Sequence, residues 1–172
     1  MKVFLLDTKL HDRRKFYCEE DSLTEYLQKQ ASQDMKKRLA ACFVLISGKD
    51  NFIKGYYTLT SESFNRDEIP EDYRKKIPIN YNVPVTLLGR LARDITMKGK
   101  RAGEFLLIDA LRRSYEISKK EIGSMAVVVD PINENAISFY SKYGFILLPD
   151  SGRMFLTMKA ISKLFENISD IR

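Results

Sequence analysis

Residues that hold metals or form covalent cross-links are scarce in this sequence, which has two cysteines and one histidine among 172 residues. Cys18 and Cys42 lie far apart with no second cysteine near either, so neither a disulfide framework nor a CxxC metal site is indicated. His11 has no cysteine or acidic pair at ligand spacing, and we expect it to be a surface or capping residue. The sequence therefore predicts no metal, and its reduced thiols favour a cytoplasmic location.

Long apolar runs are also missing. The apolar stretch that begins at Met1 ends before Asp7, too short for a signal peptide, and no segment approaches the roughly 18 apolar residues of a membrane span. We expect a soluble cytoplasmic protein without a membrane partner. There is no internal repeat or low-complexity tract, and the proline-containing stretch 67–84 is predicted to be a loop with local turns. A single domain over residues 1–172 is expected.

Hydrophobic and basic residues are what the sequence does contain. Hydrophobic residues make up 44% and aromatic residues 11%, which is enough to bury a core. Lysine and arginine total 29 against 23 aspartates and glutamates, giving a net charge of +6. This balance favours a polyanionic ligand such as nucleic acid, CoA or a membrane surface, and charge alone does not choose among them.

Near the N-terminus the pattern predicts one helix and one hairpin. The segment Ser22 to Glu25 fits a capping box, and Leu23, Tyr26, Leu27 and Ala31 recur after it at helical spacing. The stretches 41–46 and 52–59 are rich in β-branched and aromatic residues and flank the turn 48–51. An antiparallel pair of strands is predicted there.

Two strand–helix units are predicted next. Residues 85–92 are typical of a buried strand and precede a glycine-containing loop and a helix through 106–111. Residues 125–129 form a second apolar run of strand length, followed by helical periodicity over 135–143 that ends at Gly144.

The C-terminal part predicts a second hairpin. Residues 145–148 and 154–158 are expected to be strands around the turn 149–152, and 161–165 a short final helix. An early hairpin, central strand–helix units and a late hairpin together predict an α+β fold with a mixed sheet.

The loop from Lys98 to Gly103 is the best candidate for binding phosphate. It places two glycines, two lysines and an arginine between a buried strand and a helix start, where free backbone N–H groups and the helix dipole favour an anion. The loop matches neither GxxxxGK[ST] nor GxGxxG, which disfavours P-loop NTPases and dinucleotide-binding enzymes. A solvated basic turn is the alternative interpretation of the same residues.

Four segments carry a resemblance to a known family. Residues 88–94 read LGRLARD, which resembles the LGRLAVD segment on the central strand of the GNAT superfamily. Within it, the sequence is similar to the acetyltransferase toxins that modify aminoacyl-tRNA and are paired with a small DNA-binding antitoxin. Residues 135–145 resemble the late family helix with its FYxxYGF ending, and residues 16–18 and 55–59 are similar to the toxin branch. The resemblance covers nearly the whole chain.

The resemblance implies a GNAT-like acyl-CoA N-acyltransferase fold, with a central, mostly antiparallel mixed sheet flanked by helices. It implies an acetyl-CoA-dependent N-acetyltransferase that uses acetyl-CoA as acetyl donor, with Tyr140 as the general acid for the CoA thiolate and Arg90 as a substrate-binding residue. The positions that would bind acetyl-CoA are Leu91, Ala92, Arg93, Lys98, Gly99, Lys100, Arg101, Ala102, Gly103, Glu104 and Asn135.

The loop departs from the family pattern at two positions. The family usually has Q-G-x-G-x-G, whereas Lys98 stands here for the Gln and Arg101 for the middle Gly. The backbone donors survive this change, so we expect acetyl-CoA binding to persist. The open question is the backbone geometry of the loop at Arg101, where the family has a glycine.

Alternatives remain for several residues and for the function. Tyr140 also fits an aromatic core stripe at helical spacing, and Arg90 and Arg93 also fit surface ion pairs. Aminoacyl-tRNA is the expected acceptor, and a protein or small-molecule amine, or a non-catalytic CoA-binding module, are the rivals. The resemblance also implies an antitoxin partner and a homodimer. Three basic clusters are candidates for a tRNA-binding surface: residues 36–38, 98–101 and 112–113.

Overall fold

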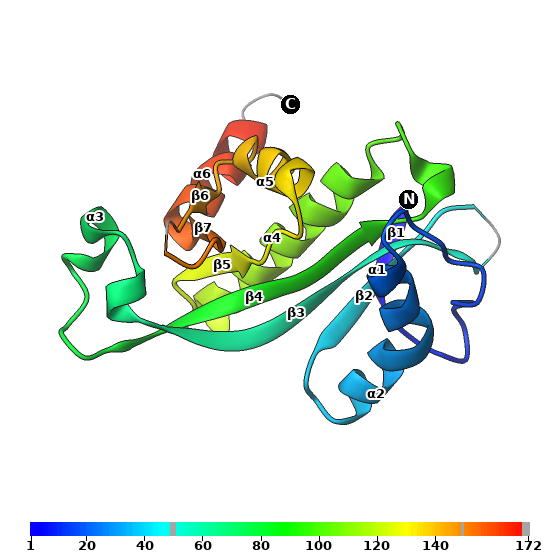
Figure 1. Cartoon of the computed structure of the whole chain (residues 1–172), viewed down its shortest axis with the longest axis horizontal. Helices are drawn as coiled ribbons and strands as arrows, with labels where there is room; N and C mark the ends of the chain where they lie inside the picture. The colour runs from blue at the N-terminus through cyan, green and yellow to red at the C-terminus, as the bar shows by residue number, and fades with distance from the viewer. Residues whose placement is uncertain (49–50, 149, 170–172) are drawn as a thin grey trace. The chain divides into compact units, whose positions relative to one another are not determined.

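The computed structural model in Figure 1 describes residues 1–48, 51–148 and 150–169. The chain divides into two compact units, the first formed by Met1–Thr60 and Leu88–Ala110 and the second by Ser61–Leu87 and Leu111–Arg172. Each unit has a hydrophobic cluster of its own. The expectation of a single domain over the whole chain stays a prediction.

Seven strands in the described residues have the order β1-β2-β3-β4-β5-β7-β6. The pairs β1–β2, β2–β3, β5–β7 and β6–β7 are antiparallel. The predicted α+β class with a mostly antiparallel sheet is therefore confirmed. The strands are β1 (Lys2–Leu5), β2 (Ala41–Ile46), β3 (Ile53–Asn65), β4 (Asn82–Arg93), β5 (Ala126–Val129), β6 (Ile146–Leu147) and β7 (Met154–Thr157).

The helices follow the predicted order, with additions. The stretch 67–84 contains two short helical turns before β4 begins, and the final helix is longer than predicted at both ends. Among the described residues no helix could span a bilayer. The helices are α1 (Asp21–Glu25), the π-helical η1 (Tyr26–Gln30), α2 (Ala31–Lys36), the 3-10 turns η2 (Arg66–Glu68) and η3 (Ile95–Met97), α3 (Glu71–Arg74), α4 (Ala102–Lys120), α5 (Glu134–Ser141) and α6 (Met158–Ser169).

The core of the first unit lies between the N-terminal helices and one face of the strands. Tyr26, Leu27 and Ala31 recur at helical spacing and are buried against the strand residues Val44 and Tyr56. The helix spacing and the hairpin of β2 and β3 are as predicted, although residues 49 and 50 of the predicted turn lie outside the described residues.

The predicted capping box at Ser22 is wrong. The helix begins at Asp21, after Glu20, which makes no side-chain cap hydrogen bond. The Ser22 hydroxyl donates to Glu20 Oε1 (3.0 Å), so it is engaged away from the helix amides. A capping box does occur at the start of η2, where Asn65 and Glu68 exchange side-chain and backbone hydrogen bonds.

An arginine organises the polar part of the second unit. Arg153 donates to both carboxylate oxygens of Glu62 on β3 (2.9 and 2.8 Å) and to Asp130 Oδ1 after β5 (2.6 Å). Through the bidentate pair with Glu62 and the further bond to Asp130, Arg153 joins three parts of the chain that are far apart in sequence. Pro149, in the predicted turn 149–152, lies outside the described residues.

Candidate functional site

The C-terminal half of β4 holds the first group of predicted site residues. Ala92 is buried in the core of the first unit, while Leu91 and Arg93 are half-buried. Asp94 then fixes the chain where the strand ends: its carboxylate accepts from the backbone N–H groups of Thr96 (2.9 Å) and Tyr17 (3.1 Å). The strand therefore enters the following loop in a defined direction.

A glycine on β3 lets the neighbouring elements of the first unit approach closely. A Cβ added at Gly55 would lie 2.7 Å from Leu106 Cδ1 and 3.0 Å from the carbonyl oxygen of Ala92. Both distances are shorter than ordinary contacts, so a larger residue at Gly55 would displace β4 or α4. The glycine thus helps to set the position of the strand and of the helix that flank the loop.

The loop itself contains two residues with left-handed backbone conformation. Gly99 has φ +74° and Arg101 has φ +55°. A Cβ at Gly99 would meet nothing within 4 Å, so backbone conformation rather than space favours glycine there. Arg101, which replaces a family glycine, adopts the backbone region that glycine visits easily. The loop therefore keeps a glycine-like turn at Arg101 despite the side chain.

Backbone donors gather where this loop becomes α4. The carbonyl of Arg101 accepts from the N–H of Phe105 (3.0 Å), so the helix starts directly after Arg101. The N–H groups of Ala102, Gly103 and Glu104 consequently have no acceptor within the helix, and the positive end of the helix dipole lies at the same place. Three amides and a dipole of this kind suit a phosphate group.

Two of the predicted cationic residues meet at one carboxylate. Lys98 Nζ lies 2.7 Å from Glu19 Oε1, and Arg93 Nη2 lies 3.3 Å from Glu19 Oε2. The hydrogen bond from Lys98, reinforced by the charge of Arg93, lowers the pKa of Glu19. Sequence reasoning missed Glu19, because 79 residues separate it from Lys98 and no local pattern announces the pair.

The remaining loop cations are more accessible. Lys100 is exposed and forms no ion pair with a carboxylate of the described residues. Arg101 lies 3.9 Å from Glu104 and its side chain is 85% exposed, so this pair holds it weakly. These two cations remain accessible to an anionic ligand of the loop.

Arg90 occupies a different place on β4. Its guanidinium carbon lies 3.6 Å from the centroid of the Tyr26 ring, a cation–π contact with the π-helical turn η1. No carboxylate in the described part of the chain forms an ion pair with Arg90, so the surface ion pair considered for it is not observed there. Arg90 and Arg93 thus have different partners, a ring and a carboxylate.

Tyr140 and Asn135 belong to the second unit, on α5. The Tyr140 side chain is 8% exposed and its ring lies 5.3 Å from the rings of Phe139 and Phe145. Burial raises the pKa of Tyr140 above its usual range, which keeps the phenol protonated near neutral pH. The helix is capped by Asn133, whose Oδ1 accepts from the N–H of Ala136 (2.9 Å), so Asn135 is not needed as the cap.

The Tyr140 hydroxyl has no hydrogen-bond partner among the described residues. Within the same residues, no fully buried side-chain oxygen or nitrogen lacks a partner, so this hydroxyl must reach solvent. A protonated, unpaired phenol at the surface of an aromatic cluster is suited to donate a proton. Tyr140 therefore has the core packing considered for it, and its role as an acid stays a prediction.

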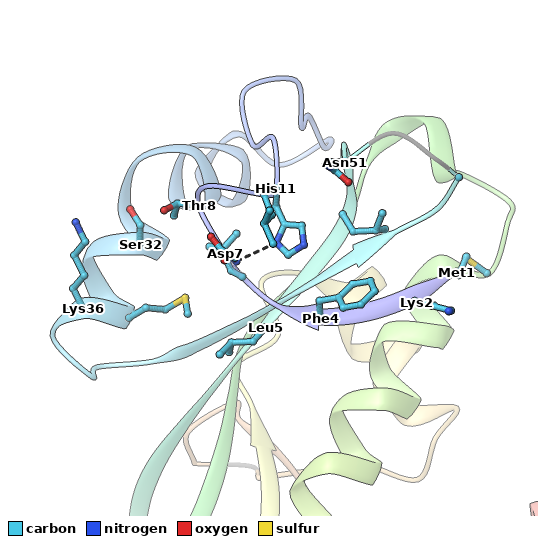
Figure 2. Close-up of a pocket in the computed structure, with 15 residues that line it drawn as sticks. Met1, Lys2, Phe4, Leu5, Asp7, Thr8, His11, Ser32, Lys36 and Asn51 are labelled. Carbon is cyan, nitrogen blue, oxygen red and sulfur yellow. Dashed lines mark hydrogen bonds between the residues drawn. The ribbon is translucent and has the colours of Figure 1, made fainter.

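An open hollow of about 1000 Å³ lies elsewhere in the first unit, between β1, the loop after it and α2 (Figure 2). Its apolar side chains include Phe4 and Leu5, which are 45% and 54% exposed. His11 accepts a hydrogen bond from the N–H of Asp7 at Nδ1 (3.0 Å). None of the predicted site residues lines this hollow, and within the described ranges no cluster of acidic, His or Cys side chains could hold a metal.

No family model matches the chain. Curated relatives do match it, among them two toxins. A tRNA-acetylating toxin of Mycobacterium tuberculosis is 34% identical over 149 residues, covering 86% of this chain and 87% of the relative. A probable toxin TacT of Sinorhizobium fredii is 28% identical over 167 residues, covering 92% of each.

Solved structures agree with these relatives. A mutant of KacT superposes with a TM-score of 0.88 at 30% identity, covering 95% of this chain and 98% of the other. AtaT complexed with acetyl-methionyl-tRNAfMet gives 0.87 at 28% identity, with the same coverage. AtaTR bound with acetyl-CoA gives 0.82 at 30% identity, covering 95% and 97%. The similarity extends over both units of the chain.

Proposed function

Because the chain belongs to the tRNA-acetylating toxins of the GNAT superfamily, we propose that it transfers the acetyl group of acetyl-CoA to the α-amino group of an aminoacyl-tRNA and so inhibits translation. The observation that carries the proposal is the similarity along most of the chain to a relative whose activity is tRNA acetylation. A cytoplasmic location and an antitoxin partner, such as AtaR in complexes of AtaT, are parts of the same proposal.

The loop before α4 fits the pyrophosphate of acetyl-CoA. The loop offers backbone donors at Ala102, Gly103 and Glu104, next to the left-handed turns at Gly99 and Arg101. It also offers the positive charge of the exposed Lys100, which no carboxylate of the described residues neutralises. Acetyl-CoA supplies a thioester, which is the activated acetyl group. Leu91 and Ala92 would offer backbone groups to the pantetheine arm, with Arg93, Lys98 and Asn135 as further contacts of the cofactor.

The acceptor needs little help to lose a proton. An α-amino group has a pKa of about 7.7–8.0 in model peptides, so a useful fraction is already neutral near pH 7. The reaction instead needs a proton for the departing thiolate. Tyr140 is our candidate for this general acid, since its raised pKa keeps the proton on the phenol and its hydroxyl has no competing partner in the described residues.

Arg90 is our candidate for a substrate contact. One face of its guanidinium contacts the Tyr26 ring. The N–H groups point outward in the plane of the guanidinium, where they can donate to an acceptor such as a phosphate oxygen. The absence of an ion pair for Arg90 in the described part of the chain supports this assignment.

The test is an acetyl-transfer assay with labelled acetyl-CoA and total charged tRNA. We expect label on tRNA, recovered on the amino acid after mild base cleaves the aminoacyl ester. A matched sample of deacylated tRNA should remain unlabelled. Label on added proteins or small amines instead would reassign the acceptor, and no transfer at all despite acetyl-CoA binding by calorimetry would favour a non-catalytic CoA-binding module.

A further inference from the structure

A second hollow in the first unit has a strongly basic lining. It measures about 500 Å³ and lies between the loop after β1 and the π-helical turn η1. Its lining includes four cationic side chains and one carboxylate, and Leu10 is the one apolar side chain among the described lining residues. The lining residues are Thr8, Lys9, Leu10, His11, Asp12, Arg13, Arg14, Gln28 and Lys29.

Hydrogen bonds join the two walls of this basic hollow. Gln28 Nε2, on the helical wall, donates to the carbonyl oxygens of Phe16 (2.9 Å) and Arg14 (3.3 Å) on the loop. In the other direction, Arg13 Nη1 donates to the carbonyl oxygen of Leu27 (3.4 Å). A β-bridge from Asp12 to Phe52 ties the loop to the sheet edge. The hollow is therefore a built feature of the unit and does not depend on one mobile side chain.

The cations around the hollow are not equally available. Arg14 is neutralised by Asp12, through Nε to Oδ1 (3.0 Å) and Nη2 to Oδ2 (2.9 Å). Lys29 pairs with Glu25 (3.1 Å). Lys9 and Arg13 form no ion pair with any carboxylate of the described residues. Two uncompensated charges at a concave surface concentrate positive potential there, because the low-dielectric walls focus the field.

The chemistry of the lining favours one class of ligand. A guanidinium, an ammonium and the hydroxyl of Thr8 offer donors for phosphate oxygens, whereas a single leucine offers little to an amphipathic acidic peptide. The apolar surface that such a peptide requires lies instead in the larger hollow (Figure 2), which shares Thr8, Leu10 and His11 with the basic one. Phosphodiester groups are therefore the better match to the basic hollow.

We propose that this basic hollow binds backbone phosphates of the tRNA substrate, with Lys9 and Arg13 each contacting one phosphate. The proposal rests on the proposed function and adds an RNA contact outside the acetyl-CoA loop. Neutralising phosphates with lysine and arginine releases counterions, so the contacts contribute affinity that is lost as salt is raised.

The test compares the double variant Lys9→Gln/Arg13→Gln with the parent in filter binding of total tRNA between 50 and 200 mM KCl. We expect affinity about tenfold weaker at 0.1 M salt and a log–log salt slope reduced by about two, one for each lost phosphate contact. Acetyl-CoA affinity by calorimetry and the thermal unfolding temperature should match the parent. The control Lys76→Gln/Lys163→Gln makes the same charge change at exposed positions of the second unit and should alter the slope by less than half as much.

The outcomes separate this site from the proposed function. If the parent acetylates aminoacyl-tRNA while the double variant keeps its tRNA affinity, salt slope and KM, the RNA site is overturned and the function stands. If the parent transfers no acetyl group to tRNA but binds it with a slope that the double variant loses, the site stands and the function fails. Unchanged tRNA binding together with lost binding of poly-glutamate would overturn the phosphate assignment in favour of an acidic peptide.

Discussion

Arg90 and Tyr26 form a stacked pair in the first unit, with 3.6 Å between the guanidinium carbon and the ring centroid. The ring is itself held: the Tyr26 hydroxyl donates to Asp34 Oδ2 (2.9 Å), and Gln30 Nε2 donates to Asp34 Oδ1 (2.8 Å). Burial raises the pKa of Tyr26 above its usual range, so the hydroxyl keeps its proton. The π-helical turn η1 thus holds the uncharged Tyr26 ring in place against the Arg90 guanidinium.

This pair predicts a difference between two substitutions of Tyr26. Tyr26→Leu removes the ring, and we expect the KM for aminoacyl-tRNA to rise about two- to fivefold with little change in kcat, since a cation–π contact whose cation keeps part of its hydration is worth about 0.5–1 kcal/mol. Tyr26→Phe keeps the ring and should leave KM close to the parent value. Steady-state kinetics check both, and equal effects of the two variants would contradict a role for the ring.

The acid role of Tyr140 predicts a loss of turnover without a loss of binding. Tyr140→Phe keeps the contacts with Phe139 and Phe145, so the unfolding temperature and the acetyl-CoA affinity should be unchanged. The value of kcat should fall by about 10²- to 10⁴-fold, the usual contribution of a positioned acid. Tyr143→Phe, in the same aromatic stripe, is the control and should retain activity. An unchanged kcat in Tyr140→Phe would leave this residue with a packing role alone.

Gly55 predicts a steric cost at the centre of the first unit. Gly55→Ala brings a Cβ to 2.7 Å from Leu106 and 3.0 Å from the Ala92 carbonyl. We expect the free energy of unfolding to fall by about 1–3 kcal/mol, the range for overpacking a core. Gly123→Ala meets nothing within 4 Å and should be neutral or slightly stabilising in the same denaturant titration. Equal stability of the two variants would show that β3 moves freely at this point.

Arg101 predicts an order of stability among three residues. Its φ of +55° costs a residue with a side chain about 1–2 kcal/mol, a cost that glycine does not have. Arg101→Gly should therefore be at least as stable as the parent, whereas the β-branched Arg101→Val should unfold at a lower temperature and bind acetyl-CoA more weakly. Calorimetry measures both properties. A valine variant as stable as the glycine variant would contradict the left-handed conformation.

The contact of Asp12 with Arg14, in the lining of the basic hollow, is predicted to make the stability of the protein sensitive to acid. The hydrogen bond from the Arg14 side chain lowers the pKa of Asp12 from 3.8 to about 2. Since this pKa is lower in the folded than in the unfolded chain, the stabilising contribution is present above pH 4 and is lost as pH falls from about 4 to about 2. In carboxyl-carbon NMR, Arg14→Gln should return the midpoint toward 3.8. Lys15→Gln should shift it much less, because the charge of Lys15 is the smallest cause; the reverse order would contradict this assignment.

The strand, loop and helix around the candidate acetyl-CoA site could be predicted because each depends on local pattern. Apolar runs of strand length and helical periodicity are properties of neighbouring residues, and β4 and α4 appear where these patterns lie, although both extend further. The capping box at Ser22 failed for a related reason. Its hydroxyl donates to the Glu20 side chain instead of accepting from a helix amide, and the local pattern allows either contact.

The side-chain partners could not be predicted, because they join residues that only the fold brings together. Glu19 meets Lys98 across 79 residues of sequence, and Tyr26 lies under Arg90 through the packing of η1 on the sheet. Composition indicated that cations are abundant but not which of them are neutralised. The distinction between Arg14, which Asp12 neutralises, and Arg13, for which the described residues offer no carboxylate, depends on geometry alone.

Both cysteines of the chain are buried in the first unit, Cys18 at 5% exposure and Cys42 at 0%. Burial also raises the pKa of Cys42 to about 12, so only a small fraction of this side chain is the reactive thiolate even when a reagent reaches it. A thiol reagent should therefore label Cys42 at a rate set by how often its surroundings open. Because the second unit has no cysteine, the rate of thiol labelling in the unaltered protein reports the opening of the first unit alone.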